Sequence, residues 1–323
     1  MTGLPPYIVL GNLYDVLSAA QLSDVVMHSF CVQADQTKLQ AWLDKAFAEP
    51  SGGAVRYEAV GDKLFLSFAE IGQARALGKR GGADGYVGEI DTTVWLLARR
   101  LDDGLFALRW IPVYLFVDSG TAQATGREVW GFPKQLGRFR FSPQNPDRAA
   151  PRDFGVDALV VAEYAPNAKA NWATIFEARP LTAKGGGHSG GLLGSLRALA
   201  GKAVERLTGA FTTIAVQLET ALGDGGMVMV MLKQFPDSAD PTRACYQGII
   251  EAQATINGFR GAGLTDNHYE VRITSYDSHP FWGELGVQDD WQEVGQGVWI
   301  DFDFEQHLGA EVWRAGGEDA AQP

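Results

Sequence analysis

A single lysine, Lys134, follows a proline in a run that is otherwise rich in glycine and large apolar residues. The run reads Gly126-Arg-Glu-Val-Trp-Gly-Phe-Pro-Lys134-Gln-Leu-Gly137, and its glycines allow tight backbone geometry. Lysines at solvated positions usually have polar neighbours, whereas Trp130, Phe132 and Leu136 lie close to this one in sequence. An amine in apolar surroundings loses the hydration of its charged form, which lowers an amine pKa. A neutral amine of this kind condenses with a ketone or keto acid to form a Schiff base.

Schiff-base chemistry also needs a group that moves protons while the carbinolamine forms and breaks down. Glu89 and Asp91 lie two residues apart at the start of an expected strand, so both share a face with Trp95. The alternative reading of this pair is a solvated strand end. Glu128, inside the lysine run, is another candidate. Arg127 could bind a substrate carboxylate or form a structural ion pair with Glu128.

The lysine run resembles the lysine motif of the acetoacetate decarboxylase family. The matching residues are Gly126-Arg127-Glu128, Gly131-Phe132-Pro133-Lys134 and Leu136-Gly137, and the Schiff-base lysine of the family falls on Lys134. Residues 231–237 and 245–256 resemble a later strand pair of the family, joined by a turn that carries a proline. The likeness runs from about residue 29 to residue 304. Family members carry glutamates near their lysine, and one of these falls around Glu89.

Two departures from the family pattern bear on the substrate. The best-known decarboxylases of the family carry two adjacent lysines, and the second helps to lower the pKa of the first. This chain has the neutral Gln135 at the second position. These decarboxylases also share an arginine on an early strand, whereas no arginine precedes Arg56 here. Desolvation must therefore keep Lys134 neutral unless Arg127 or another cation folds close by.

The resemblance implies a cofactor-independent Schiff-base lyase that acts on a small keto acid, with decarboxylation as the favoured reaction. One alternative is a pyruvate-type aldolase or dehydratase that uses the same lysine. Another is a non-catalytic protein that binds a small acid. We expect the catalytic residues to be Lys134, Glu89 and Glu128, and the substrate-binding residues to be Arg127, Phe132, Gln135 and Trp95.

The composition narrows the classes of partner. The chain has 323 residues, of which 46% are hydrophobic and 20% charged, which is ordinary for a soluble globular protein. Its formal net charge of -12 disfavours nucleic acid as a partner. No stretch approaches the ~18 apolar residues of a membrane span, and the N-terminus does not read as a secretory signal, so we expect a cytoplasmic protein. The five histidines and two cysteines lack metal-ligand spacing, and no dinucleotide fingerprint occurs. We therefore expect neither a metal nor a cofactor.

Turn signals and apolar patterning predict many strands and few helices. We expect a helix over residues 35–47 with Asp35 as its cap, and one or two helical turns within residues 119–129. Strands over residues 55–60 and 63–68 are expected to meet in a hairpin at Gly61-Asp62. Further strands are expected over residues 90–100, 105–117, 138–141, 158–164, 173–178, 226–235, 246–256, 269–275 and 298–304.

This pattern predicts an α+β fold made mainly of antiparallel strands, with helices at its periphery. The family resemblance implies a cone-shaped closed β-barrel that holds the lysine in its interior. We expect one domain over residues 1–323, with a glycine-rich insertion and helix at 181–209 and a polar tail at 309–323. The family commonly forms homo-oligomers, and we expect the same here.

Overall fold

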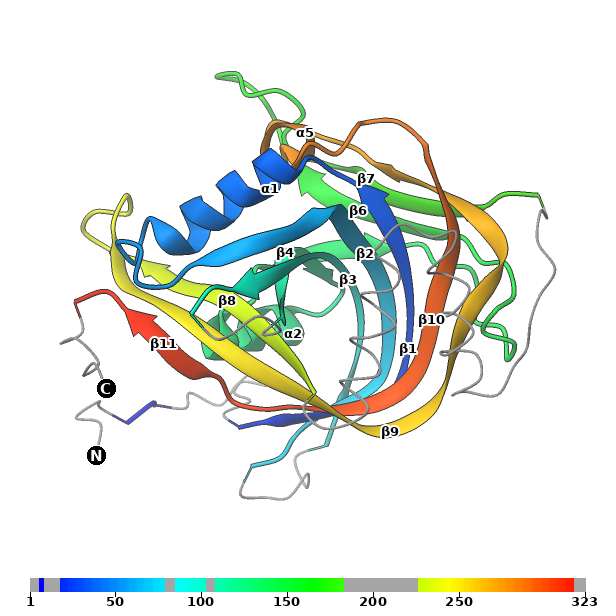
Figure 1. Ribbon diagram of the computed structural model, residues 1–323, viewed down its shortest axis with the longest axis horizontal. Helices are drawn as coiled ribbons and strands as arrows, with labels where there is room; N and C mark the ends of the chain where they lie inside the picture. Colours follow the sequence, from blue (N-terminus) through cyan, green and yellow to red (C-terminus); the bar gives the residue numbers. More distant parts are fainter. Residues whose placement is uncertain (1–5, 9–17, 79–84, 103–107, 183–225, 317–323) are drawn as a thin grey trace.

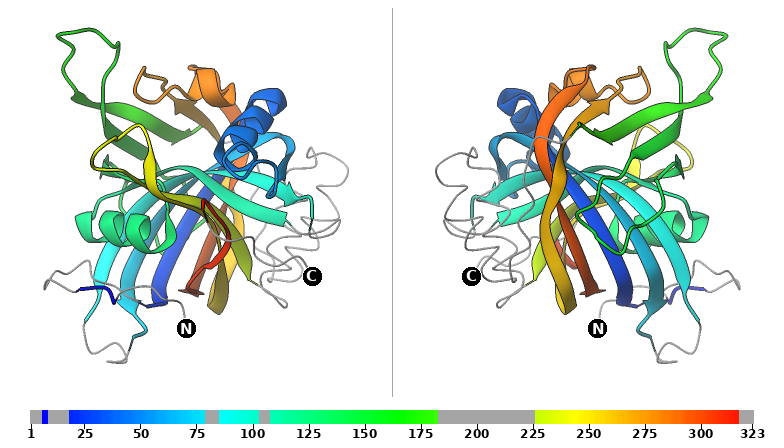
Figure 2. Two further views of the ribbon diagram at one scale, coloured as in Figure 1. Left: turned by 90° about the vertical axis from the view of Figure 1, so that its left-hand side faces the viewer. Right: turned by 90° about the vertical axis from the view of Figure 1, so that its right-hand side faces the viewer.

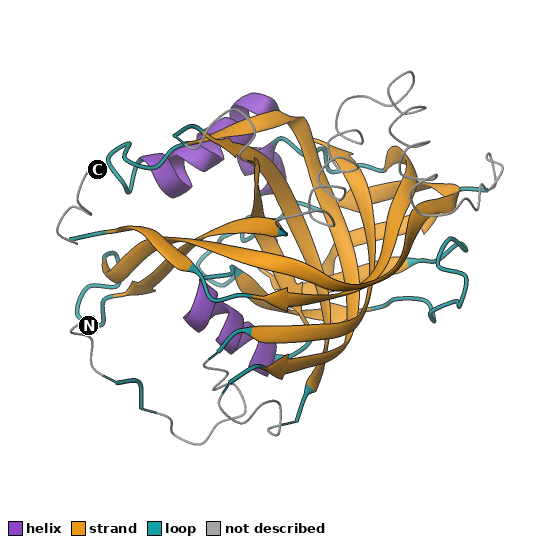
Figure 3. Cartoon of the chain, turned by 60° about the horizontal axis from the view of Figure 1, so that its bottom comes forward, coloured by secondary structure: helices purple, strands orange, loops and turns teal. Residues whose placement is uncertain are grey.

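A computed structural model of the protein describes residues 6–8, 18–78, 85–102, 108–182 and 226–316. The insertion expected at 181–209 lies outside these ranges from residue 183 onward, as does the end of the expected tail from residue 317. Most of the described chain forms strands, and the few helices lie at the edge of the sheet (Figure 1, Figure 3). The expectation of a mainly antiparallel β fold with few helices is confirmed. No described helix combines the length and the apolar character that crossing a bilayer requires.

The strands contain most of the ordered backbone. They are β1 (Ala20–Gln33), β2 (Tyr57–Ala76), β3 (Val87–Arg100), β4 (Leu108–Val117), β5 (Lys134–Phe139), β6 (Phe154–Val160), β7 (Asn171–Pro180), β8 (Met227–Pro236), β9 (Ala244–Ile273), β10 (Gln292–Gln306) and β11 (Ala310–Arg314). The helices are α1 (Gln36–Leu43), α2 (Gly120–Thr125) and α5 (Phe281–Leu285), and the π-helical segments η1 (Asp44–Ala48) and η2 (Gly126–Trp130) extend α1 and α2.

Neighbouring strands pair in the order β10-β1-β2-β3-β4-β5-β6-β7-β9-β11, and β9 also pairs with β10. Strand β8 pairs with β9 and, through Trp110 and Met229, with β4. The pairings are antiparallel except those of β4 with β5 and of β4 with β8. Parallel strands need a crossover between them. Segments α2 and η2 provide it, because they carry the chain from the end of β4 back to the start of β5.

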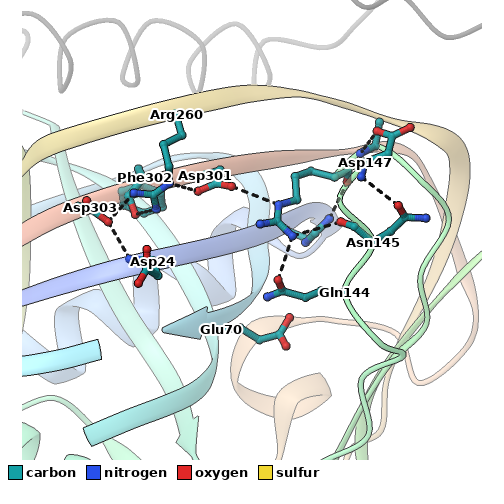
Figure 4. Close-up of polar contacts among 12 residues, drawn as sticks. Asp24, Glu70, Gln144, Asn145, Asp147, Arg260, Asp301, Phe302 and Asp303 are labelled. Atoms are coloured by element: carbon teal, nitrogen blue, oxygen red, sulfur yellow. Dashed lines mark hydrogen bonds and ion pairs between the residues drawn. The ribbon is translucent and has the colours of Figure 1, made fainter. Parts of the chain in front are cut away.

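An ion-pair network links the strands where β1, β9 and β10 lie side by side (Figure 4). Arg260 on β9 donates to the carboxylates of Asp301 and Asp303 on β10. Asp303 also accepts a hydrogen bond of 2.7 Å from the backbone N of Asp24 on β1. Asp24 has a φ of 55°, and the register between β1 and β10 shifts between Leu22 and Val25. The network therefore spans a β-bulge that bends β1.

Two sequence predictions placed an interruption where the structure has one continuous strand. No hairpin forms at Gly61-Asp62, because β2 runs through it as one strand of 20 residues. Gly61 has a φ of 74°, and the register with β3 shifts between Ala59 and Leu64. A glycine with positive φ serves a bulge as well as a turn, and the sequence pattern does not separate the two. Likewise, the strands expected at 246–256 and 269–275 form one strand, β9, of 30 residues.

Two other predictions concern the ends of elements. The helix expected over residues 35–47 forms as α1 and η1, and the carboxylate of Asp35 accepts a hydrogen bond of 3.0 Å from Lys38 N. The expected cap is confirmed. The segment expected to be a polar tail from residue 309 instead forms β11 at residues 310–314, which pairs with β9. Its Val312 and Trp313 pack against the core, so apolar burial gives this segment its order.

Alternate side chains of the central strands point to two different faces. One face is a packed core in which aromatic rings meet closely. The rings of Phe68 and Phe154 stack at 4.7 Å, and those of Phe30 and Tyr269 lie 4.7 Å apart. Helices α1 and α5, which lie together at one end of the molecule (Figure 2), add apolar side chains to this core. The other face surrounds a cavity, and the candidate active site lies on that face.

Candidate active site

The cavity face of the sheet encloses about 260 Å³. Its lining comes from strands β1 to β5 and β8 to β10, together with α2 and η2. Small residues leave the space open on the β1 and β2 side. Ser29 and Ser67 pair across these strands with their hydroxyl oxygens 2.9 Å apart, and Ala69, Ala74 and Ala76 follow along β2. These residues of β2 are smaller than those on its opposite face, and this leaves space for the cavity.

Lys134 is the first residue of β5, and its amine lies inside the cavity. Its Nζ donates a hydrogen bond of 2.6 Å to Oε1 of Glu89, which projects from β3. The two side chains are 13% and 5% exposed. The ring centroid of Phe132 lies 6.0 Å from the amine. The predicted lysine and its predicted carboxylate partner are thus in direct contact, although 45 residues separate them in the sequence.

The glycines of the lysine run have packing roles that position Lys134. A Cβ atom at Gly126 would lie 2.6 Å from Cδ of Lys134, so the lysine stem packs directly on the glycine backbone. Segment η2 ends at Gly131, whose φ of 86° lies in the left-handed region that glycine favours. A Cβ there would also approach within 2.6 Å of Cβ of Lys233 on β8. Both glycines are therefore needed to bring the lysine into the cavity.

A second carboxylate, Asp91, lies on the same face of β3. Burial and, to a lesser extent, the negative charge of Glu89 raise the pKa of Asp91 to about 7, although the charge of Lys134 and a hydrogen bond from Thr93 act in the opposite direction. Burial disfavours the ionised form of a carboxyl group, and a nearby like charge adds to the effect. Near neutral pH the site therefore holds one carboxyl group that is partly protonated.

Imine chemistry requires a nucleophile, a proton acceptor and a proton donor, and this arrangement offers a group for each. A neutral amine at Lys134 can act as a nucleophile, the carboxylate of Glu89 is within hydrogen-bond distance to accept its proton, and Asp91 can donate a proton to a departing hydroxyl group. Pairs of carboxyl groups with different proton affinities commonly divide the roles of acid and base in this way. In the described part of the chain, no group of three or more His, Cys, Asp or Glu side chains is arranged to hold a metal ion.

The structure brings some of the predicted site residues together and separates others. Phe132 and Trp95 line the cavity with Lys134 and Glu89. Gln135 points to the opposite face of β5, where its side-chain oxygen lies 3.0 Å from Nε2 of His279, because successive residues of a strand alternate. The expectation that Gln135 contacts the substrate from beside the lysine does not agree with this placement.

Arg127 and Glu128 lie outside the cavity. Both side chains are exposed, and neither lines it. The guanidinium of Arg127 instead donates a hydrogen bond of 3.3 Å to the backbone oxygen of Lys134. These two residues follow Gly126 on η2, and a helical segment turns successive side chains to different sides, so only Gly126 faces the lysine. Proximity to Lys134 in sequence therefore does not place them at the reacting amine.

Sequence reasoning left Asp91 out of the expected catalytic group, although its spacing from Glu89 gave the signal. It also missed most of the apolar lining. Of the described residues that line the cavity, Lys134 and Arg75 are the cations. The guanidinium of Arg75 donates to Gln73 at 2.5 Å and lies 5.6 Å from the ring centroid of Tyr86. Arg75 follows Ala74, which pairs with Val87, two residues before Glu89 on β3.

Comparisons with known proteins support the fold. No family model and no curated protein matches the sequence. An acetoacetate decarboxylase from Legionella pneumophila subsp. pneumophila str. Philadelphia 1 matches with a TM-score of 0.60 and 14% identity, over 98% of this chain and 95% of that one. An acetoacetate decarboxylase-like enzyme from Sphingomonas wittichii RW1 matches with a TM-score of 0.57 and 11% identity, over 97% and 100%. The chain therefore has an acetoacetate decarboxylase-like fold, which confirms the expected resemblance at that level.

A third match has a bound ligand. The enduracididine biosynthesis enzyme MppR, solved in complex with pyruvate, matches with a TM-score of 0.54 and 14% identity, over 92% of this chain and 90% of that one. Proteins with this fold thus include one named as a decarboxylase and one that holds a keto acid. At these identities the comparisons establish the fold, and the chemistry has to be argued from the residues in the cavity.

Proposed function

We propose that this protein is a cofactor-independent Schiff-base enzyme in which Lys134 attacks the carbonyl carbon of a keto acid. The contact between Lys134 Nζ and Glu89 Oε1, 2.6 Å long and enclosed in an apolar cavity, carries the proposal. The similar solved structures add support, because they include acetoacetate decarboxylases and a complex with pyruvate. Lys134 is also the first residue of β5, where its backbone pairs with Leu115 of β4.

The cavity residues divide the first steps between them. Glu89 accepts a proton from the amine of Lys134, and the neutral nitrogen then attacks the carbonyl carbon to give a carbinolamine. The protonated carboxyl group of Asp91 donates its proton to the carbinolamine hydroxyl group, which leaves as water. The nitrogen lone pair forms the C=N bond, and the product is an iminium ion on Lys134.

The favoured second half of the reaction is decarboxylation. In a β-keto acid, the carboxylate is attached to the carbon next to the iminium carbon. The electrons of that carbon–carboxylate bond move toward the iminium nitrogen, carbon dioxide leaves, and an enamine remains. A carboxyl group of β3 protonates the enamine carbon, and water then hydrolyses the imine to release a ketone and free Lys134.

An aldol or dehydration reaction is the second candidate, and one observation favours it. The cavity presents no described cation beside the amine, because Gln135 faces away and Arg127 is exposed. The best-known decarboxylases that this chain resembles carry a second lysine at the position of Gln135, and the cation is absent here. An enamine formed from a pyruvate-like substrate keeps its carboxylate and attacks an aldehyde, so this reaction does not depend on the loss of a carboxylate beside such a cation.

We also propose that the sheet closes around the cavity as a barrel within a single domain. The support is the pairing pattern, in which β1 to β7 lead from strand to strand, β7 pairs with β9, β9 pairs with β10, and β10 pairs with β1. A closed sheet leaves no free edge around the cavity and shields the amine from bulk water.

Borohydride trapping followed by intact-mass measurement tests the proposed chemistry. The protein is incubated with acetoacetate or pyruvate, reduced, and compared with Lys134→Ala and with Lys45→Ala, a control at a lysine that is 70% exposed. We expect an adduct in the wild type and in Lys45→Ala, and none in Lys134→Ala. The added mass shows whether the carboxylate is retained, which separates aldol chemistry from decarboxylation. An adduct that persists in Lys134→Ala, or no adduct with either acid, would contradict the proposal, and the second outcome would indicate a non-catalytic binding protein.

A further inference from the structure

The cavity is larger than a small keto acid requires. An apolar cavity of about 150 Å³ is sufficient to bind benzene, so the 260 Å³ here has room for about ten non-hydrogen atoms. A keto acid of three or four carbons fills only part of that space. Water is a poor occupant of the remainder, because a buried water needs two to four polar partners.

The carboxylates and the amine of the cavity lie close together on one side of it, whereas other polar residues of the lining, Arg75, Thr121, Thr125 and Gln306, belong to other elements. Register places Ser29, Ser67 and Thr93 at one level of three adjacent strands, with Asp91 and then Glu89 at the next two levels of β3. Lys134 pairs with Leu115, which is itself the partner of Thr93, and its side chain reaches Glu89 from there. The reactive groups therefore occupy the β3 and β5 side of the cavity.

The β1 and β10 side is mostly apolar, with Ser29 and Gln306 as the polar residues that these two strands add to the lining, and we call its apolar part the apolar wall. Its members are Leu22, Val25, Val298, Ile300, Phe302 and Phe304. Val25 pairs with Phe302 and Leu22 with Phe304, so the side chains continue along both strands beyond the level of Glu89. The rings of Phe302 and Phe304 stack at 5.5 Å. No charged side chain belongs to this wall among the described residues of the lining.

We propose that the substrate of Lys134 carries an apolar alkyl group of about four or five carbons, which packs on the apolar wall while its carbonyl meets the amine. This inference rests on the proposed Schiff-base function and names its substrate class. Each methylene group moved from water onto this wall strengthens binding about fourfold. A charged group packed among these six side chains would find no charged partner among them and would weaken binding. The natural substrate is therefore a keto acid whose apolar chain is longer than a methyl group, and acetoacetate itself is a short analogue.

A series of neutral methyl ketones tests the substrate class without the effect of a carboxylate. Acetone, 2-pentanone, 2-heptanone and 2-nonanone are each trapped on the wild-type protein with borohydride, and the concentration that gives half of the maximal adduct is measured. We expect this concentration to fall about fourfold per added methylene and to level off near ten non-hydrogen atoms. A concentration that stays constant along the series, or rises with chain length, would overturn the proposal.

A binding measurement separates this inference from the Schiff-base proposal. In Lys134→Ala no imine forms, and binding of the same ketones is followed by the fluorescence of Trp95, Trp110 and Trp130, which line the cavity. We expect the same gain in affinity with chain length. If adducts form in the wild type but affinity does not rise with chain length, the apolar wall is rejected as a binding surface and the lysine chemistry is retained. If affinity rises with chain length in Lys134→Ala but the wild type forms no adducts, the Schiff-base chemistry is rejected and the apolar wall is retained as a binding surface.

A cavity-filling variant tests whether the gain in affinity with chain length comes from the apolar wall. Ala74 pairs with Leu22 and lines the cavity, so Ala74→Phe places a ring against the apolar wall, while Leu159→Ala is a control at an outer side chain that is 52% exposed. We expect Ala74→Phe to lose most of the gain with chain length and Leu159→Ala to keep it. A full gain in a folded Ala74→Phe protein, checked by circular dichroism, would overturn the assignment to this wall. If Ala74→Phe does not fold, the wild-type series decides alone.

Discussion

The two faces of the central strands have opposite constructions, although they belong to the same residues in alternation. On β2, Leu64, Leu66 and Phe68 point into the packed core, whereas Ser67, Ala69 and Ile71 point toward the cavity. The packed face fills its space with rings and branched chains, and the cavity face leaves room with small side chains. The same difference separates Lys134 from Gln135 on β5. The packed face contributes stability through close packing. The cavity face lacks part of that packing and leaves a space around the amine of Lys134.

The largest effect is expected on the cavity face. Glu89→Gln removes the group that accepts a proton from Lys134, and we expect the rate of adduct formation to fall by about 10²- to 10⁴-fold. The matched control is Glu128→Gln, because Glu128 is exposed and does not line the cavity. We expect the control to change the rate by less than about twofold. Equal losses in the two variants would show that our assignment of Glu89 as the proton acceptor is wrong.

A substitution in the packed face should act on stability. Phe68 is 1% exposed and stacks on Phe154, so Phe68→Ala should cost about 3 to 5 kcal/mol of unfolding free energy. Phe304 borders the cavity and is only partly buried. We expect Phe304→Ala to cost less than half as much, because a cavity already lies beside the ring. Urea unfolding of both variants measures the difference, and a larger loss at Phe304 would contradict the contrast between the two faces.

The pKa of Asp91 gives the cavity face its own pH dependence. Burial raises this pKa from 3.8 to about 7, so the folded state binds the proton more tightly than the unfolded state does. Ionising Asp91 therefore costs stability as the pH rises from about 4 to about 7, and the cost is complete above that range. Asp91→Asn removes this cost. We expect the variant to match the wild type near pH 4 and to gain roughly 2 to 4 kcal/mol relative to it above pH 7. A difference in unfolding free energy between variant and wild type that does not vary with pH would contradict the raised pKa of Asp91.

The smallest effect is expected at Gln135, next to the lysine but on the packed face. Gln135→Ala removes the hydrogen bond with His279, a net contribution of about 1 kcal/mol to the unfolding free energy. Since the side chain points away from the cavity, the ketone concentration for half-maximal trapping should change by less than about twofold. Thermal unfolding and the trapping assay together check this. A large change in the ketone concentration for half-maximal trapping, with normal stability, would show that Gln135 contributes to substrate binding.

The sequence predicted the local parts of this molecule well. The cap at Asp35, the helical turns before the lysine run and the pair of Glu89 with Trp95 on one face depend on short-range rules of spacing and hydrogen bonding. The lysine itself was recognisable because a cation among apolar residues is costly unless it has a function.

The parts that failed depend on tertiary context. Gly61 has the same backbone requirement in a bulge as in a turn, so only the pairing partner of β2 decides between them. Arg127 and Glu128 stand near Lys134 in sequence, yet η2 turns them to solvent. The apolar wall comes from β1 and β10, whose residues look like ordinary core in the sequence, because periodicity reveals which residues are inward and not whether the space between them is filled.

The pairing of β1 with β10 also determines when the site can first exist. It joins Met27 to Ile300 and Ala20 to Gln306, so strands from nearly opposite ends of the described chain form adjacent walls of one cavity. Contacts of such high sequence separation form slowly, because the chain between them must be ordered first. During synthesis the ribosome releases the lysine run long before β10. The lysine run is therefore synthesised long before the cavity is complete, and under the proposed function Lys134 becomes reactive only once β10 has paired with β1.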